Sequence, residues 1–342
     1  MEEREGKGLT LKRIALILIV ACLLQPLAAC AERTGDAGYA AMSANLVHEL
    51  EQTSKFQKKE LWIVPTYERS GEGWTENGTL PHKTEVIVRE KIASDEEGGY
   101  LLVETADGQE QVYISTDNYL PKELRYRAQD GTIVSYYLYV PETENADQKW
   151  PILIYFHGTR DTVERHHGIG ELLPTNRIKP NGIVILPQAV NETTDADFQR
   201  LPYQDAVIEL AKDIAGKYGG DLSRLSVSGH SDGGSAAYKI VNRHPGLFAA
   251  CAPISAIGTT EEGIKRTNLW YFQGAKDPWV KMYIGLRVPQ RCENSGCNAM
   301  HYVYKNEGHE IQTMVFQDTF TDENGRETKL IDWLMSKQIA SE

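Results

Sequence analysis

A glycine-rich segment, Gly229-His-Ser-Asp-Gly-Gly234, constrains the fold of this chain more than any other feature. It follows an apolar run at residues 224–228 that predicts a buried strand, and it precedes a helix-like run at residues 235–244. A Gly-x-Ser-x-Gly sequence at a strand-to-helix turn is typical of a nucleophile elbow. Such a turn is too tight for β-carbons beside the serine, and it places the hydroxyl above a helix N-terminus that favours negative charge. Ser231 is therefore the candidate nucleophile.

A serine hydroxyl is a poor nucleophile at neutral pH, so it needs a base and an acid that orients the base. Asp277 follows the end of one predicted strand, and His309 follows the end of the next. We expect Asp277 to be the acid and His309 to be the general base. Asp205 and Asp332 are poorer candidates for the acid, because one precedes the nucleophile and the other follows His309 inside a predicted helix.

A continuous apolar run at residues 150–156 predicts a buried parallel strand, which opens into a loop that begins His157-Gly158-Thr159. A loop at this place in the order of elements suits an oxyanion hole. We expect the His157 side chain to hold the backbone of this loop, and contact with the substrate is the alternative.

From about Leu124 to the C-terminus, the chain resembles an α/β-hydrolase. It is most similar to the secreted esterase and peptidase-like branch, which includes feruloyl-esterase-like and polyhydroxybutyrate-depolymerase-like proteins. The motifs that carry the resemblance, in chain order, are His157-Gly158, Gly229-His-Ser-Asp-Gly233, Gly274-Ala-Lys-Asp277 and Gly308-His309. The resemblance implies a mainly parallel central sheet with helices on its faces.

The same resemblance implies acyl transfer through an acyl-enzyme. Ser231 would attack a carbonyl carbon, His309 would take and return the proton, and Asp277 would hold the imidazole. The backbone N–H groups of Thr159 and Asp232 would form the oxyanion hole. This chemistry requires no cofactor and no metal.

The expected activity is that of a carboxylesterase acting on small, polymer-linked or carbohydrate-linked esters. Trp279, two residues beyond Asp277, is the candidate substrate contact. The chain has no large apolar lid insertion, so a long-chain lipase is less expected. Two alternatives remain: a serine peptidase of the prolyl-oligopeptidase-like type, and a non-catalytic binding lipoprotein of the cell envelope.

The first residues have the pattern of a targeting segment. Lys12-Arg13 precede a short apolar stretch, and Leu27-Ala-Ala-Cys30 closes it. Small residues before a cysteine resemble a bacterial lipobox, which implies a signal peptide at residues 1–29, a lipid-linked Cys30 and a position outside the cytoplasm in the bacterial cell envelope. The alternative is an ordinary signal peptide cut near Ala29.

Residues 30–57 are expected to form a spacer, residues 58–120 a β-rich domain and residues 121–342 the catalytic domain. The short strands predicted in the β-rich domain resemble a bacterial SH3-like barrel, which implies contact with the cell wall. The alternative is an ordinary β-extension of the hydrolase. Trp62, Tyr67 and Trp74 could line a binding face, but we expect them to pack in the core.

Two cysteines near the C-terminus, Cys292 and Cys297, stand close enough in the sequence to predict a disulfide in an oxidising compartment. No further ligands stand beside them at the spacing of a metal site. The formal net charge is −12, and the chain has no basic run of the kind that binds nucleic-acid phosphates. We therefore expect no nucleic-acid partner.

Overall fold

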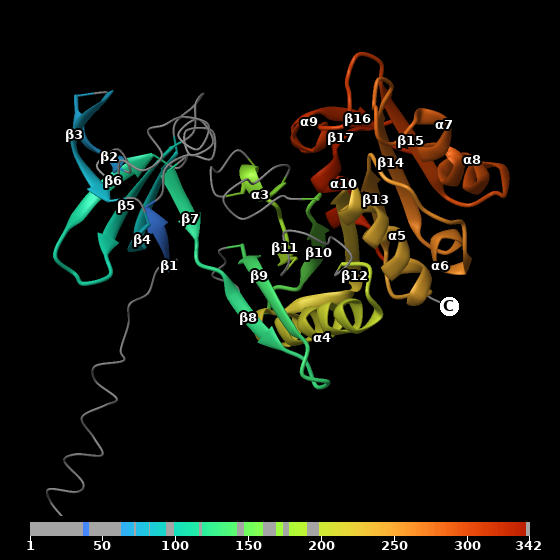
Figure 1. Cartoon of the computed structure of the whole chain (residues 1–342), viewed down its shortest axis with the longest axis horizontal. Coiled ribbons are helices and arrows are strands. Elements are labelled where there is room, and N and C mark those ends of the chain that lie inside the picture. Colours follow the sequence, from blue (N-terminus) through green and yellow to red (C-terminus); the bar gives the residue numbers. More distant parts are fainter. Residues whose placement is uncertain are drawn as a thin grey trace, which may run out of the picture.

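The computed structural model describes residues 37–40, 63–71, 73–81, 83–93, 99–115, 118–141, 147–159, 169–173, 178–189 and 198–339. The predicted signal peptide, Cys30 and most of the predicted spacer lie outside the described residues. Within these ranges, no helix is both long enough and apolar enough to cross a membrane. Two large β-sheets, one formed by the N-terminal part of the chain and one by the rest, organise the molecule (Figure 1).

The larger sheet has eight strands in the order β15-β14-β13-β12-β10-β11-β9-β8. Its strands are β8 (Leu124–Arg127), β9 (Ile133–Tyr139), β10 (Trp150–Phe156), β11 (Ile183–Gln188), β12 (Gly220–His230), β13 (Ala250–Ile254), β14 (Asn268–Gly274) and β15 (Ala299–Tyr304). Strands β10 to β15 pair in parallel, whereas β9 runs antiparallel to β11 and β8 antiparallel to β9. The predicted mainly parallel sheet is confirmed.

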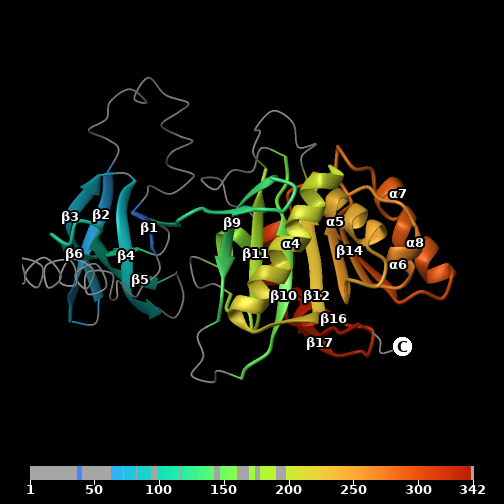
Figure 2. The same cartoon turned by 90° about the horizontal axis from the view of Figure 1, so that it is seen from below.

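Helices cover both faces of this sheet (Figures 1 and 2). They are α3 (Ile169–Leu172), α4 (Leu201–Tyr218), α5 (Asp232–Arg243), α6 (Glu262–Lys265), α7 (Met282–Gly285), α8 (Arg287–Asn294), α9 (Gln312–Gln317) and α10 (Leu330–Ser336). Side chains of α4, α5 and α8 pack against one face of the sheet and form one apolar cluster with it. Side chains of α3, α9 and α10 pack against the other face and form a second cluster. Every residue of β10 and β11 is buried, because each strand has helices on both sides. A short hairpin of β16 (Thr319–Thr321) and β17 (Glu327–Lys329) precedes α10.

The ends of helix α4 follow from its sequence. Pro202 stands in its first turn, where a missing N–H costs no hydrogen bond. Gly219 ends the helix in the left-handed conformation, with φ of 72°, and donates its N–H to the carbonyl of Ala215. The chain then enters β12, which leads to the elbow.

The N-terminal sheet has seven antiparallel strands in the order β3-β2-β6-β5-β4-β1-β7. Its strands are β1 (Ala37–Ala40), β2 (Ile63–Ser70), β3 (Gly73–Pro81), β4 (Thr84–Ala93), β5 (Gly99–Thr105), β6 (Gln111–Ser115) and β7 (Tyr119–Pro121). Buried and half-buried residues alternate along β5, as in a strand with one face on a core. That core is small, and its buried members are Val64, Leu80, Val86, Val88, Leu101, Val103 and Ile114.

Two details of this sheet differ from the predictions. Residues 37–40, expected in the spacer, form β1 and pair with both β4 and β7. Tyr67 and Trp74, expected in the core, are half-buried on the other face of the sheet, where the Trp74 ring stacks on Tyr100 with centroids 4.1 Å apart. Cross-strand aromatic contacts of this kind stabilise the sheet without entering its core. The likeness to an SH3-like barrel stays a prediction.

Candidate active site

The predicted nucleophile lies on a strained turn between β12 and α5. Ser231 has φ of 54° and ψ of −118°, a conformation that non-glycine residues rarely adopt. A β-carbon at Gly229 would lie 2.5 Å from the backbone of Gly233, and one at Gly233 would lie 2.2 Å from the carbonyl oxygen of Phe156. The glycines are therefore required by close packing of the main chain, as the sequence pattern predicts for an elbow.

A chain of hydrogen bonds joins the three residues predicted as nucleophile, base and acid. His309 Nε2 lies 2.9 Å from Ser231 Oγ, and His309 Nδ1 lies 2.7 Å from Asp277 Oδ2. Asp277 follows β14 and His309 follows β15, so both stand beyond the carboxyl ends of neighbouring parallel strands. Because the carboxylate accepts the proton on Nδ1, Nε2 presents its lone pair to the serine hydroxyl.

Asp277 is held in a fully enclosed site. Its side chain has no exposed surface. Its Oδ1 accepts hydrogen bonds from the backbone N–H groups of Trp279 and Val280 at 2.8 and 2.9 Å. Its Oδ2 accepts from Gln273 Nε2 at 3.1 Å as well as from His309. A buried carboxylate is tolerated when its oxygens are satisfied in this way, so the orientation of the acid is fixed before any substrate arrives.

Gln273 is a site residue that the sequence analysis did not identify. It is the next-to-last residue of β14 and is fully buried. Its amide nitrogen donates to Asp277 and to the carbonyl of Val280, and its amide oxygen accepts a hydrogen bond from the Tyr271 hydroxyl. The signal was a glutamine at the end of an otherwise apolar strand, since such residues are buried only when they have hydrogen-bond partners.

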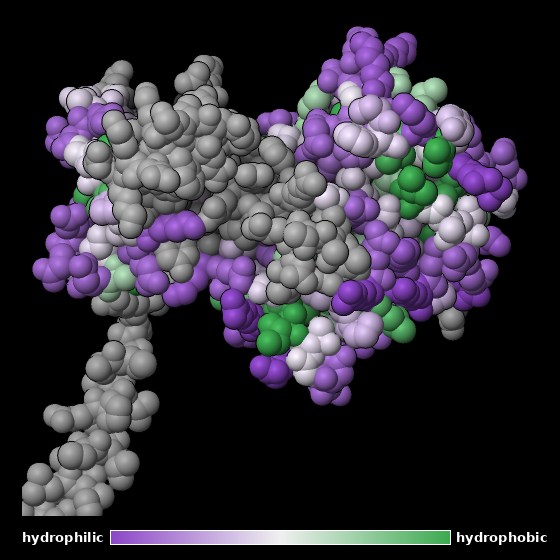
Figure 3. Space-filling model, viewed as in Figure 1, coloured by the Kyte–Doolittle hydropathy of each residue, from purple (hydrophilic) through white to green (hydrophobic). Residues whose placement is uncertain are grey.

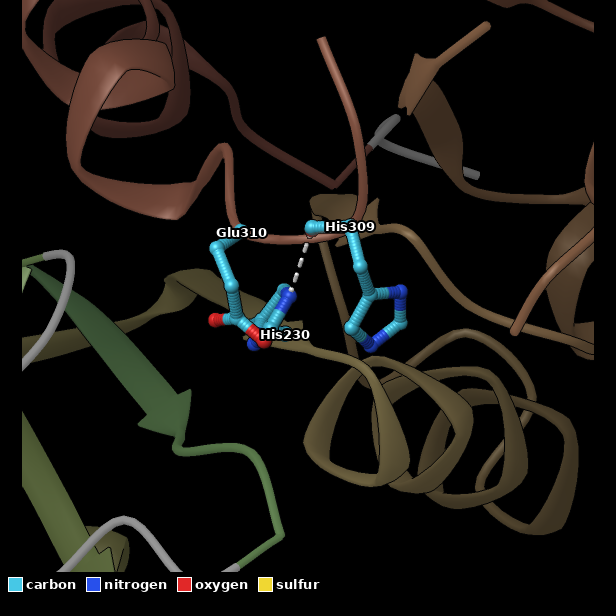
Figure 4. A group of neighbouring side chains, drawn as sticks. All are labelled: His230, His309 and Glu310. Carbon is cyan, nitrogen blue, oxygen red and sulfur yellow. Dashed lines mark hydrogen bonds between the residues drawn. The ribbon is translucent and has the colours of Figure 1, made fainter. Parts of the chain in front are cut away.

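The main chain of the base is held as well. The carbonyl oxygen of His309 accepts hydrogen bonds from His230 Nε2 at 3.0 Å and from Ser255 Oγ at 2.9 Å. His230 is the last residue of β12 and Ser255 follows β13. The ends of these two adjacent strands therefore hold the loop that carries His309. The rings of His230 and His309 lie 4.8 Å apart (Figure 4). His230 therefore packs beside His309 and holds its main chain.

The loops that carry the acid and the base touch through two glycines. A β-carbon at Gly274 would lie 1.8 Å from the carbonyl oxygen of Gly308. The backbone N–H of Ala275 also donates to the backbone carbonyl of Tyr304, and the N–H of Lys276 donates to the carbonyl of Glu307. The separation of the Asp277 and His309 loops is thus set by the main chain.

The two residues predicted to form the oxyanion hole lie next to each other in space, Thr159 in the loop after β10 and Asp232 at the start of helix α5. The Thr159 hydroxyl donates a hydrogen bond to the Asp232 carboxylate, and this bond connects the two segments. Asp232 begins α5, where backbone N–H groups have no partner within the helix. This place suits stabilisation of an oxyanion.

His157 and Trp279, predicted near the substrate, lie in contrasting surroundings. The Nδ1 of His157 donates to the carbonyl of Gly158 at 2.7 Å, and its Nε2 accepts the N–H of Ala189 at 3.2 Å. Both ring nitrogens thus bond to the main chain, which favours the structural interpretation of this residue. The side chain of Trp279 is largely in solvent, with 77% of its surface exposed.

The structure also corrects the predicted disulfide, because Cys292 and Cys297 are free thiols. The turn that joins them is closed by backbone bonds, including Cys297 N–H to the carbonyl of Cys292 at 3.0 Å, and needs no covalent link. Burial, with the neighbouring Cys297 as a lesser cause, raises the pKa of Cys292 to about 12. Cys251 is also a buried free thiol.

Comparison with known proteins bears on the fold and the family resemblance. The model of the Esterase family matches residues 130–287, which include the elbow and Asp277. A thermostable esterase of known structure is 15% identical, with a TM-score of 0.50 over 83% of this chain and 92% of that one. The fold is that of an α/β-hydrolase. The predicted resemblance to the esterase branch is confirmed at this level.

Other α/β-hydrolase structures match less of the chain. A CE1 ferulic acid esterase from Anaeromyces mucronatus is 14% identical, with a TM-score of 0.44 over 56% of this chain and 85% of that one. An acylaminoacyl peptidase from Pyrococcus horikoshii is 12% identical, with a TM-score of 0.44 over 72% and 49%. No curated protein matches the chain.

Proposed function

We propose that this α/β-hydrolase is a serine carboxylesterase in which Ser231, His309 and Asp277 form the catalytic triad. The observation that carries the proposal is the continuous hydrogen-bonded chain from the Asp277 carboxylate through His309 to the Ser231 hydroxyl. The strained elbow beneath the serine and the enclosed acid add to it, because both fix the geometry before substrate binds.

In the first half of the reaction, Ser231 Oγ attacks the ester carbonyl carbon while His309 Nε2 takes the hydroxyl proton. The carbonyl oxygen becomes an oxyanion that accepts hydrogen bonds from the N–H groups of Thr159 and Asp232. Collapse expels the alcohol, which receives the proton from His309. A water molecule then attacks the acyl-enzyme while His309 takes its proton. His309 returns this proton to Ser231 Oγ as the carboxylic acid leaves.

The surface favours small or polar esters over long-chain lipids. Where Figure 3 colours the face of the catalytic domain, that face is mostly hydrophilic, with apolar side chains in small patches. Exposed large apolar or aromatic side chains near the acid are Trp279, Met282 and Tyr283. We assign Trp279 to contact with the acyl or leaving group, since its backbone already touches Asp277 and its ring faces solvent.

Labelling with a fluorophosphonate tests the serine mechanism. The wild-type protein should label stoichiometrically and hydrolyse p-nitrophenyl acetate and butyrate, and Ser231→Ala should do neither. Ser235→Ala is the matched control, because Ser235 lies one turn further along α5, where its hydroxyl accepts the N–H of Ile257. A folded wild-type protein that does not label would overturn the proposal and favour a binding lipoprotein.

We place the enzyme at the bacterial cell envelope, held to the membrane by a lipid on Cys30. The support is the Leu27-Ala-Ala-Cys30 sequence after a short apolar stretch. Detergent phase partition of the protein expressed in bacteria tests this, since Cys30→Ala should move it from the detergent phase to the aqueous phase. Equal partition of both forms would contradict the anchor.

A further inference from the structure

Three side chains with metal-ligand chemistry meet at the base. His230, His309 and Glu310 each offer one ligand atom, and these atoms lie within 4.8 Å of one another. Figure 4 shows the Glu310 carboxylate beside the His230 ring, with the His309 ring on the other side of that ring. Two of the residues are adjacent in the sequence, whereas His230 comes from the end of β12.

Hydrogen bonds fix the tautomers of both histidines. His309 donates from Nδ1 to the Asp277 carboxylate, so its lone pair is on Nε2. His230 donates from Nε2 to the backbone carbonyl of His309, so its lone pair is on Nδ1. Metal-binding histidines almost always donate their second ring nitrogen to a carboxylate or a backbone carbonyl, and these two residues use one of each.

The third ligand is oriented in the same manner. Glu310 Oε2 accepts a hydrogen bond from Gln312 Nε2 at 2.9 Å, and Gln312 is itself only 2% exposed. Glu310 is exposed, which gives a cation a route from solvent to the two more deeply placed imidazoles. Each of the three candidate ligands therefore has an outer partner that directs it.

We infer that this cluster is a regulatory site for a divalent transition-metal ion of the Zn²⁺ type, bound by His230 Nδ1, His309 Nε2 and the Glu310 carboxylate. Two imidazoles and one carboxylate are a common zinc set that leaves a fourth position open. Bond lengths of about 2.0–2.2 Å place such ligand atoms roughly 3.4 Å apart. The ligand atoms, which lie within 4.8 Å of one another, must therefore move closer by up to about 1.4 Å. The exposed Glu310 side chain can supply its own part of that movement, and the two imidazole rings must supply the rest.

Metal binding would inhibit the enzyme, an effect that rests on the proposed function. The lone pair on His309 Nε2 is the one that takes the proton from Ser231, so it cannot serve the metal and the serine at once. Removal of the ion restores the base, because no bond other than the coordination bonds has formed.

The binding experiment uses the full chain with Ser231→Ala, so that it does not depend on catalysis. Chelator-stripped protein is titrated with Zn²⁺ against a chromophoric chelator, and Co²⁺ is used to record visible absorption. Glu310→Gln in the same background should weaken Zn²⁺ binding at least about tenfold, since even outer partners of metal ligands contribute that much. Glu327→Gln, at an exposed acid in β17, is the matched control and should bind as the parent does.

The inhibition experiment uses the otherwise wild-type enzyme with p-nitrophenyl acetate. Zn²⁺ should suppress turnover, EDTA should restore it, and Glu310→Gln should need at least about tenfold more Zn²⁺ for half-inhibition relative to its own metal-free rate. Zn²⁺ affinity that is the same with and without Glu310 would overturn the inference. Glu310-dependent binding by a wild-type protein that hydrolyses no ester would instead refute the proposed function and leave the metal site standing.

Discussion

The two sheets of this chain bury their side chains in different ways. In the catalytic sheet, every residue of β10 is buried, and apolar clusters lie on both faces. In the N-terminal sheet, buried and half-buried residues alternate along β5, and the described residues form one core cluster with seven buried members. The difference follows from the connections, because parallel strands need crossovers whose helices cover both faces, whereas antiparallel strands can leave one face to water.

This difference explains where the chemistry lies. The carboxyl ends of β12, β14 and β15 meet at one edge because these strands are parallel, so Ser231 and His309 meet across 78 positions of sequence. In an antiparallel sheet, neighbouring strands end at opposite edges, and no such convergence occurs. Four predictions test whether catalysis and stability divide between the sheets in this way.

The largest effect is expected at the acid. Asp277→Asn should lower kcat by about 10⁴-fold, because an amide favours the wrong imidazole tautomer. Steady-state kinetics with p-nitrophenyl acetate measure this. The control is Glu104→Gln, which removes a carboxylate that holds Arg89 and Gln111 in the N-terminal sheet and should leave kcat unchanged. A similar loss in both variants would show that the sheets do not act separately.

A matched pair of core substitutions compares stability. Leu153→Ala in β10 and Leu101→Ala in β5 each remove a side chain that is at most 1% exposed, and each should cost about 2–5 kcal/mol of unfolding free energy. Urea unfolding, followed by both circular dichroism and ester turnover, measures the two.

Only Leu153→Ala should shift the loss of turnover to lower urea, because Leu101 lies in the cluster of the N-terminal sheet. If Leu101→Ala moves the turnover transition equally, the two cores unfold as one unit.

A smaller effect is expected at Gln273. Gln273→Leu removes a donor to the buried Asp277 carboxylate and should lower kcat about 10- to 100-fold, the equivalent of one hydrogen bond to a charged group. KM should stay nearly constant, because Gln273 is fully buried behind the acid. A change confined to KM would indicate a role in binding and contradict a positioning role.

The smallest effect concerns the thiols. Burial raises the pKa of Cys292 to about 12, so only about one thiol in 10⁴ is ionised at pH 8. Alkylation by iodoacetamide, mapped by mass spectrometry, should be slow at Cys292 and should accelerate about tenfold for each unit of pH up to that value. Leu101→Ala should not change this rate, because Cys292 packs against the catalytic sheet. Rapid alkylation at pH 8 would disprove the buried, neutral thiol.

The sequence predicted the catalytic half of the molecule better than the N-terminal half. The elbow, the strand at residues 150–156 and the strand before Asp277 were recognisable because glycines and continuous apolar runs have strong local causes. Strand β3 was missed because almost all its residues are exposed, with Leu80 the buried exception, so it carries no alternating pattern. Strand β1 was missed because its four residues, Ala-Gly-Tyr-Ala, show no hydrophobic pattern typical of a strand. It is a strand because it pairs with β4 and β7, which lie far away in the sequence.

The hydrogen-bonded set of Ser231, Asp277 and His309 could be predicted from the sequence motifs, whereas the residues that support this set could not. Ser231, Asp277 and His309 stand in an ordered set of motifs, whereas Ser255 holds the base only because the fold brings it to the carbonyl of His309. The disulfide was predicted from spacing alone, and spacing does not reveal that backbone hydrogen bonds already close the turn after Cys292.

The contact between Gly274 and Gly308 has a consequence for how this enzyme could be switched off. A single methyl group at position 274 would collide with the carbonyl of Gly308. The loops that carry Asp277 and His309 are therefore packed so closely that no larger residue fits between them. A larger residue there would push apart the loops that carry Asp277 and His309 while leaving both side chains intact, and would break the proposed triad. In the proposed enzyme, one added carbon atom at a position outside the Ser231–His309–Asp277 set would therefore be enough to disrupt that set.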